Sequence, residues 1–64
     1  MDLNYSKAIV ELRSKLNISQ HELAAILGVS FQSVNRWENG AYEPTMKAKR
    51  KLDSLFKEHG IEVN

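Results

Sequence analysis

Cysteine is missing from this 64-residue sequence, so the chain can form neither a disulfide framework nor a cysteine-ligated zinc site. Its absence favours a reducing, cytoplasmic setting. Long apolar runs are missing too, because the longest, residues 23–29, is far shorter than the roughly 20 residues that cross a bilayer. The first residues also lack the basic and apolar regions of a signal peptide. We therefore expect a cytoplasmic protein without a membrane partner.

An excess of one charge is absent as well, since nine basic and eight acidic residues leave a net charge of +1. This total by itself says nothing about nucleic acid. The distribution is more informative, because the acidic residues are spread along the chain whereas one basic run contains no acid: Lys47, Lys49, Arg50 and Lys51. Such a run is usually a solvated helix face.

Groups that perform catalysis or bind metals are scarce. The pair His21-Glu22 begins like the zinc-protease pattern H-E-x-x-H, but Ala25 stands where the second histidine is required. His59 is isolated from it near a helix end. The sequence brings no nucleophile, base and orienting group together and has no glycine-rich phosphate loop. We therefore expect neither an enzyme nor a bound metal or cofactor.

Apolar residues recur with helical spacing and nowhere alternate as in a half-buried strand, so the sequence predicts one all-α domain over residues 1–64. The first helix is expected over about residues 4–16, with Asp2 or Asn4 as its cap. One face of it carries the apolar residues Tyr5, Ala8, Ile9, Leu12 and Leu16. The tail, residues 61–64, is expected either to fold back through Ile61 or to fray.

Capping signals mark three more helices. Ser19 and Glu22 form the S-x-x-E capping box, and Gly28 ends this second helix because a tight exit usually needs a positive φ. Its expected apolar face consists of Leu23, Ala24, Ile26 and Leu27. Ser30 caps a third helix that runs to about residue 38.

Thr45 caps the fourth helix, which is basic and reaches about residue 59, with Gly60 as its stop. The residues expected to face inward are Ala48, Leu52, Leu55 and Phe56. Together the four segments predict a compact four-helix domain.

Residues 19–38 have the spacing of a helix-turn-helix motif. Ala24 is small enough for the second and third helices to cross closely, Gly28 lets the chain reverse, and Val34 fills the interface. From spacing alone, the alternative is an αα-hairpin with a glycine turn in an unrelated bundle.

The third helix has two different sides when its residues are placed about 100° apart. Its core side is expected to hold Ser30, Val34 and Trp37. Its other side holds amides and a guanidinium without any acid: Gln32, Asn35, Arg36 and Asn39. Glutamine pairs bidentately with adenine, and arginine with guanine, in the major groove. The alternative is a generic solvated face, although such a face more often holds Glu and Lys.

Glu38 lies on the core side of this helix, where an unpaired carboxylate is costly. Arg13, at the edge of the apolar face of the first helix, is its natural partner. A planar guanidinium can satisfy the carboxylate bidentately. We therefore expect a structural ion pair between Arg13 and Glu38.

These residues closely resemble the phage-repressor and Cro-like (Xre-type) helix-turn-helix family. The runs ISQHELAAILGVS and SVNRWENG match the pattern of that family, and Pro44-Thr45 matches the start of its next helix. The similarity covers about residues 9–55. It implies a lambda-repressor-like DNA-binding fold in a prokaryotic or phage setting. It further implies a sequence-specific, repressor-like transcriptional regulator whose recognition helix, about residues 30–38, enters the major groove.

The resemblance also implies roles for single residues. The positions that read base edges are Phe31, Gln32, Asn35 and Arg36. The positions that contact phosphate are Gln20, Asn39 and the Gly40 backbone, while Ser33 touches either sugar-phosphate or base. Arg13 and Glu38 match a family pair that ties the first helix to the end of the third.

Three further assignments near the DNA follow, the first from a departure from the family pattern and the other two from the residues themselves. Phe31 replaces the polar residue often seen at its position, so it either contacts a thymine methyl group or packs at the start of the helix. Tyr42 either offers its hydroxyl to a phosphate or covers the core. The basic residues that follow the recognition helix are expected near phosphates: Lys47, Lys49 and Arg50.

The expected partner is double-stranded DNA with a near-palindromic operator bound by two copies. Many family members build their dimer interface with a fifth helix, which is not evident here, so a homodimer in solution and one formed only on DNA stay open. The competing function is a protein-interaction module whose partner is a toxin or the transcription machinery. Loss of Gln32, Asn35 and Arg36 distinguishes the two, since only DNA binding depends on them.

Overall fold

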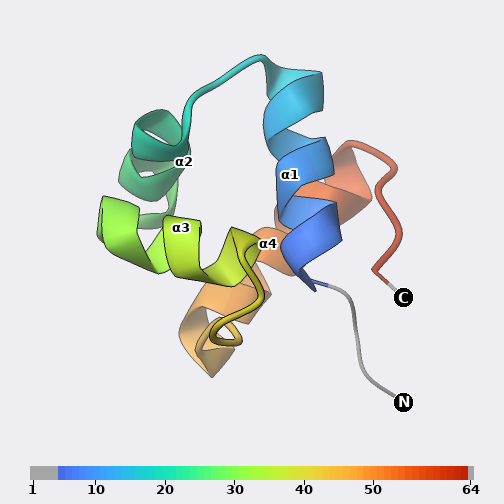
Figure 1. Cartoon of the computed structure of the whole chain (residues 1–64). Coiled ribbons are helices and arrows are strands. Elements are labelled where there is room, and N and C mark those ends of the chain that lie inside the picture. The colour runs from blue at the N-terminus through green and yellow to red at the C-terminus, as the bar shows by residue number, and fades with distance from the viewer. Residues whose placement is uncertain (1–4, 64) are drawn as a thin grey trace.

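Four α-helices occur in the part of the chain that the structure, a computed structural model, describes: residues 5–63 (Figure 1). They are α1 (Tyr5–Leu16), α2 (Gln20–Leu27), α3 (Phe31–Glu38) and α4 (Met46–Glu58). Residues 5–63 contain no strand, and the predicted all-α class is confirmed. The caps expected for the first helix, Asp2 or Asn4, lie outside the described residues.

Side-chain caps define the starts of α2, α3 and α4. Ser19 Oγ accepts a hydrogen bond from Glu22 N at 3.1 Å, and the Glu22 carboxylate accepts one from Ser19 N at 2.9 Å, which is the predicted capping box. The hydroxyls of Ser30 and Thr45 likewise accept bonds from the third residue of α3 and of α4, at 3.2 Å and 3.3 Å. Each cap contributes about 1 kcal/mol to helix stability. The helix starts follow from these local bonds.

The turn between α2 and α3 depends on Gly28. Its φ of 71° lies in the left-handed region, as predicted for the exit of the helix. Lys51 on α4 donates a hydrogen bond from Nζ to the Leu27 carbonyl at 3.1 Å. This places a positive charge at the C-terminal end of α2, where the helix dipole favours one. The turn is thus held both by its own backbone and by α4.

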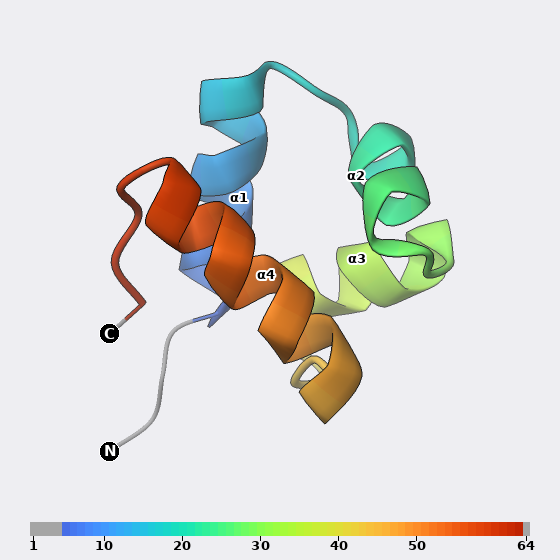
Figure 2. The ribbon, with the colours of Figure 1, turned by 180° about the vertical axis from the view of Figure 1, so that it is seen from behind.

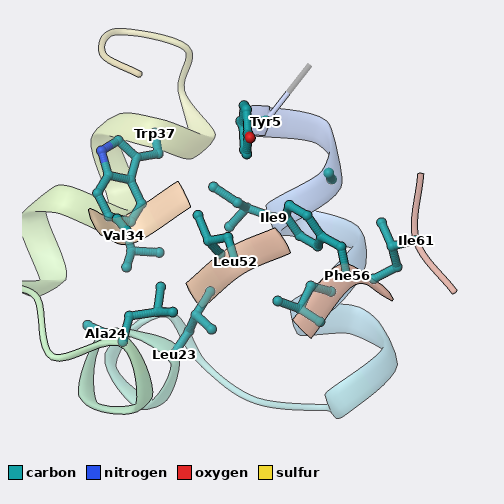
Figure 3. Close-up of a cluster of buried hydrophobic side chains, with 13 residues drawn as sticks. Tyr5, Ile9, Leu23, Ala24, Val34, Trp37, Leu52, Phe56 and Ile61 are labelled. Atoms are coloured by element: carbon teal, nitrogen blue, oxygen red, sulfur yellow. The ribbon is translucent and has the colours of Figure 1, made fainter. Parts of the chain in front are cut away.

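The core lies between α1, α2, α3 and the inner face of α4 (Figures 2 and 3). α4 packs against α1, which it crosses in Figure 2, and against α2, and Leu52 and Phe56 point from it into the core in Figure 3. Ala24 and Val34 are buried where α2 crosses α3, as the helix-turn-helix spacing predicts. Ile61 is buried too, so the chain folds back after α4.

Two expectations about the core are wrong. Ser30 is exposed because it stands before the first turn of α3, where its hydroxyl caps the helix instead of facing inward. Ile26 is 53% exposed on the outer side of α2. Leu55 packs against the core as expected, although it is only partly buried beside Leu52 and Phe56.

Candidate nucleic-acid interface

One face of α3 is left uncovered by the other helices (Figure 1). Val34 and Trp37 are buried on the opposite side and so fix the rotation of the helix about its axis. Gln32 and Arg36, one turn apart, are exposed, and Asn35 beside them is partly buried. Because the core residues set the rotation, this uncovered face is presented to solvent in a defined orientation.

A partly buried ion pair joins α1 to the end of α3. Arg13 Nε donates to Glu38 Oε2 at 2.6 Å, and an Nη of the same guanidinium donates to Oε1 at 2.9 Å. A further Nη donates to the Ile18 carbonyl at 3.2 Å. The side chain of Glu38 is 8% exposed, whereas that of Arg13 is 24% exposed. The structure therefore places these two residues in the bidentate arrangement expected from the sequence.

Hydrogen bonds extend from this pair towards the uncovered face of α3. Gln20 Nε2, at the start of α2, donates to Glu38 Oε1 at 2.8 Å. Gln20 Oε1 accepts from Asn35 Nδ2 at 3.2 Å, and Asn35 Oδ1 accepts from Asn39 Nδ2 at 3.1 Å. The sequence predicts separate DNA contacts for Gln20, Asn35 and Asn39. The structure joins these three side chains in one hydrogen-bond network. Each amide nitrogen keeps a second N–H for another acceptor.

This network controls the ionisation of Glu38. Burial would by itself raise the pKa of the carboxyl, but hydrogen bonds from Arg13 and Gln20, with the charge of Arg13, outweigh it and lower the pKa. The pKa of Arg13 is raised by its hydrogen bond to Glu38, although burial of the guanidinium acts in the opposite direction. The lowered pKa favours the ionised carboxylate of Glu38, which accepts hydrogen bonds from both Arg13 and Gln20.

Folding stability is expected to fall in acid because of Glu38. A carboxyl whose pKa is lower in the folded state stabilises the fold fully above its unfolded value, about 4.3, and loses this contribution as the pH falls through the folded value. Urea unfolding between about pH 7 and pH 3 measures the effect. Glu38→Gln should show a weaker acid dependence than the wild type, whereas Glu11→Gln, which removes an exposed carboxylate of α1, should not. Equal acid dependence in Glu38→Gln and the wild type would contradict this assignment.

An aromatic pair lies where α2 and α3 both begin. The rings of His21 and Phe31 are stacked, with centroids 4.0 Å apart and planes 5° from parallel. Phe31 nevertheless stays 37% exposed. It therefore packs at the start of α3, one of the two expected arrangements, and keeps apolar surface for a ligand. The sequence pointed to His21 only as an incomplete metal motif, because its contact depends on how α2 and α3 cross.

A second ring contact lies beyond the other end of α3. The Arg36 guanidinium carbon is 5.4 Å from the centre of the Tyr42 ring, within the range of a cation–π interaction. Tyr42 is 63% exposed, so it does not cover the core as one expectation had it. Its ring instead lies beside the Arg36 guanidinium.

The basic run of α4 is divided by the fold. Lys49 Nζ is 3.6 Å from a carboxylate oxygen of Glu43 and 5.2 Å from the centre of the Tyr5 ring. Lys51 is bound to the end of α2, as described above. Lys47 and Arg50 are exposed. Lys49 and Lys51 thus have partners within the domain, although Lys51 is exposed like Lys47 and Arg50.

Two further expected phosphate positions lie at the ends of α3. Ser33 is partly buried, and its hydroxyl is 3.0 Å from that of Ser30. Gly40 is exposed with a φ of 75° and follows the C-cap residue of α3, Asn39. Ser33 thus belongs to the first turn of α3, and Gly40 to the turn that follows the helix.

Residues 5–63 show features of neither a metal site nor a membrane span. Within this range, no three acidic or histidine side chains gather as a metal site would require. None of the described helices is both long and apolar enough to cross a membrane.

Comparison with known proteins finds a family and a relative that match this chain. The profile of a helix-turn-helix family matches residues 9–59, which include all of α2, α3 and α4. An uncharacterised HTH-type transcriptional regulator from Archaeoglobus fulgidus is 38% identical over 48 residues, which cover 75% of this chain and 68% of that protein. No solved structure matches the chain significantly. The residues that the family profile matches include the uncovered face of α3 and the hydrogen-bond network behind it.

Proposed function

Because the chain belongs to the Xre-like helix-turn-helix family of DNA-binding regulators, we propose that it recognises a specific double-stranded DNA sequence and represses transcription from it. In this proposal α3 enters the major groove. The observation that carries it is the uncovered face of α3, where Gln32 and Arg36 are exposed opposite the buried Val34 and Trp37. The proposal includes no catalytic step and no cofactor.

Base reading is assigned to the uncovered face. Arg36 donates two hydrogen bonds to a guanine, and Gln32 pairs with a neighbouring base, preferably adenine. Asn35 uses its second amide N–H towards a base edge while Gln20 holds the first. Phe31 supplies an apolar contact to a thymine methyl group.

Phosphate contacts are assigned to residues around this face: Gln20, Ser33, Asn39, Gly40, Tyr42, Lys47, Lys49 and Arg50. Gln20 and Asn39 contribute through the N–H groups that the network leaves over. Lys47 and Arg50 are exposed and can reach a phosphate directly. Lys49 contacts a phosphate in place of its ion partner Glu43. These contacts position the protein and contribute the salt-dependent part of the affinity.

Selection of binding sites from random duplex DNA tests the proposed function. One enriched sequence motif is expected, bound more tightly than a scrambled duplex. A triple variant with alanine at Gln32, Asn35 and Arg36 should fold but lose this preference. If no motif is enriched, or if the triple variant keeps it, the protein does not read DNA through α3, and the competing protein-interaction function is favoured.

Two copies are expected to bind each operator, because one domain of this size offers few base contacts. The selected motif should contain two half-sites related by two-fold symmetry, with centres about one helical turn, roughly 34 Å, apart. Analytical ultracentrifugation of the protein with a duplex carrying the motif measures the stoichiometry, and the free protein measured alongside shows whether pairing precedes binding. A one-to-one complex on the best duplex would contradict this prediction.

A further inference from the structure

We propose that His21 is a positioning residue that holds the Phe31 ring where it distinguishes thymine from other bases by its methyl group. This inference rests on the proposed DNA-binding function and adds a specificity determinant on α2. It starts from the stacked rings of His21 and Phe31, whose centroids are 4.0 Å apart.

Both partners of the stack are attached to rigid backbone. His21 belongs to the first turn of α2, which the Ser19–Glu22 capping box holds. Phe31 is the first residue of α3, next to the Ser30 cap. The caps fix where both side chains leave the backbone, so the stack has a defined position relative to the rest of the uncovered face.

The stack is also what restrains Phe31. Its side chain does not belong to the hydrophobic core cluster of the described residues, and it is 37% exposed. A ring without a core anchor would lose rotamer freedom on binding DNA, and that loss would weaken its contact. The parallel imidazole of His21 already covers one face of the Phe31 ring before DNA binds. The remaining apolar surface of that ring is thereby held in one orientation.

The chemistry of the major groove identifies the ligand of this surface. Thymine is the base that presents a methyl group there, and phenylalanine is one of the side chains that contact it. An aromatic ring offers no hydrogen bond that could specify another base edge. We therefore assign the Phe31 ring, oriented by His21, to a thymine methyl group.

Replacing thymine by deoxyuridine, which lacks only this methyl group, tests the assignment. The probe is a short duplex carrying the motif selected from random DNA, with each thymine replaced in turn. At one position of each half-site, deoxyuridine should weaken binding by the wild type about fourfold, the effect of burying one methyl group. Phe31→Ala should remove this difference.

His21→Ala should also bring the thymine-to-deoxyuridine ratio close to one, whereas His21→Phe, which preserves a stacked ring, should keep it near fourfold. His59→Ala, a histidine substitution at the C-cap of α4, should leave the ratio unchanged. In the Phe31→Ala background, His21→Ala should have no further effect on the ratio. Circular dichroism confirms that each variant is folded.

The outcomes separate this inference from the proposed function. If the wild type binds a specific motif but no thymine can be distinguished from deoxyuridine, the inference is wrong while the function stands. If His21→Ala weakens all duplexes equally and lowers the salt dependence, His21 is a phosphate contact and the inference is again overturned. If the wild type selects no motif at all, the proposed function itself fails.

Discussion

Arg13→Ala is expected to lower the free energy of unfolding by about 3 kcal/mol, because it strands the Glu38 carboxylate inside the domain. That side chain is 8% exposed and would keep only the hydrogen bond from Gln20. A domain of 64 residues has a total stability of roughly 3–10 kcal/mol, so the variant should lose between about a third of that stability and all of it. Urea denaturation followed by circular dichroism measures the change.

The reverse substitution is expected to be milder. Glu38→Ala strands Arg13, which is 24% exposed and still donates to the Ile18 carbonyl. We expect a loss nearer 1–2 kcal/mol, the lower part of the range for a hydrogen-bonded charged group. The double variant should lose less stability than the sum of the two single losses, because it leaves neither charge unpaired inside the domain.

A matched control for Arg13→Ala is Arg36→Ala, which removes an exposed arginine of α3. It should cost no more than about 1 kcal/mol, the value of an exposed cation–π contact with Tyr42. A change within about 0.5 kcal/mol for Arg13→Ala, typical of surface substitutions, would show that the ion pair does not stabilise the fold.

Arg36→Ala is expected to weaken binding to the selected motif by about 1–3 kcal/mol, or about 5- to 150-fold, while binding to a scrambled duplex changes little. The reason is the loss of a bidentate contact to guanine, which contributes only where that guanine is present. The effect should also be specific to one base pair of each half-site. Fluorescence-anisotropy titrations with both duplexes measure the two affinities.

Arg50→Ala is the matched control for this reading role, since it removes another exposed arginine, on α4. As a phosphate contact, it should weaken binding to all duplexes alike and reduce the slope of log affinity against log salt by about one unit. Lys47→Ala should behave in the same way. If Arg36→Ala instead weakened motif and scrambled duplexes in equal proportion, Arg36 would be a phosphate contact, and the assignment of the reading face would be wrong.

The boundaries of the helices could be predicted from the sequence because they depend on neighbouring residues. Ser19 with Glu22, Ser30 and Thr45 cap helices through bonds that span three residues, and Gly28 ends α2 through its own φ. The buried side of α3 was predictable for a similar reason, since Val34 and Trp37 lie three residues apart on one face. Burial was misjudged where position in the helix counts for more than the residue type, as for the exposed Ser30 and Ile26.

The sequence by itself therefore determined the four helices, the turn, the face of α3 that stays uncovered and the ion partner of Glu38. Only the tertiary structure decided how the residues of that face are held. Gln20 with Asn35, His21 with Phe31, and Arg36 with Tyr42 are pairs whose contacts no capping signal or periodicity specifies. They depend on the angle at which α2 crosses α3, on the path of the loop after α3 and on side-chain rotamers. Packing of the whole core sets these quantities, so a local pattern in the sequence does not contain them.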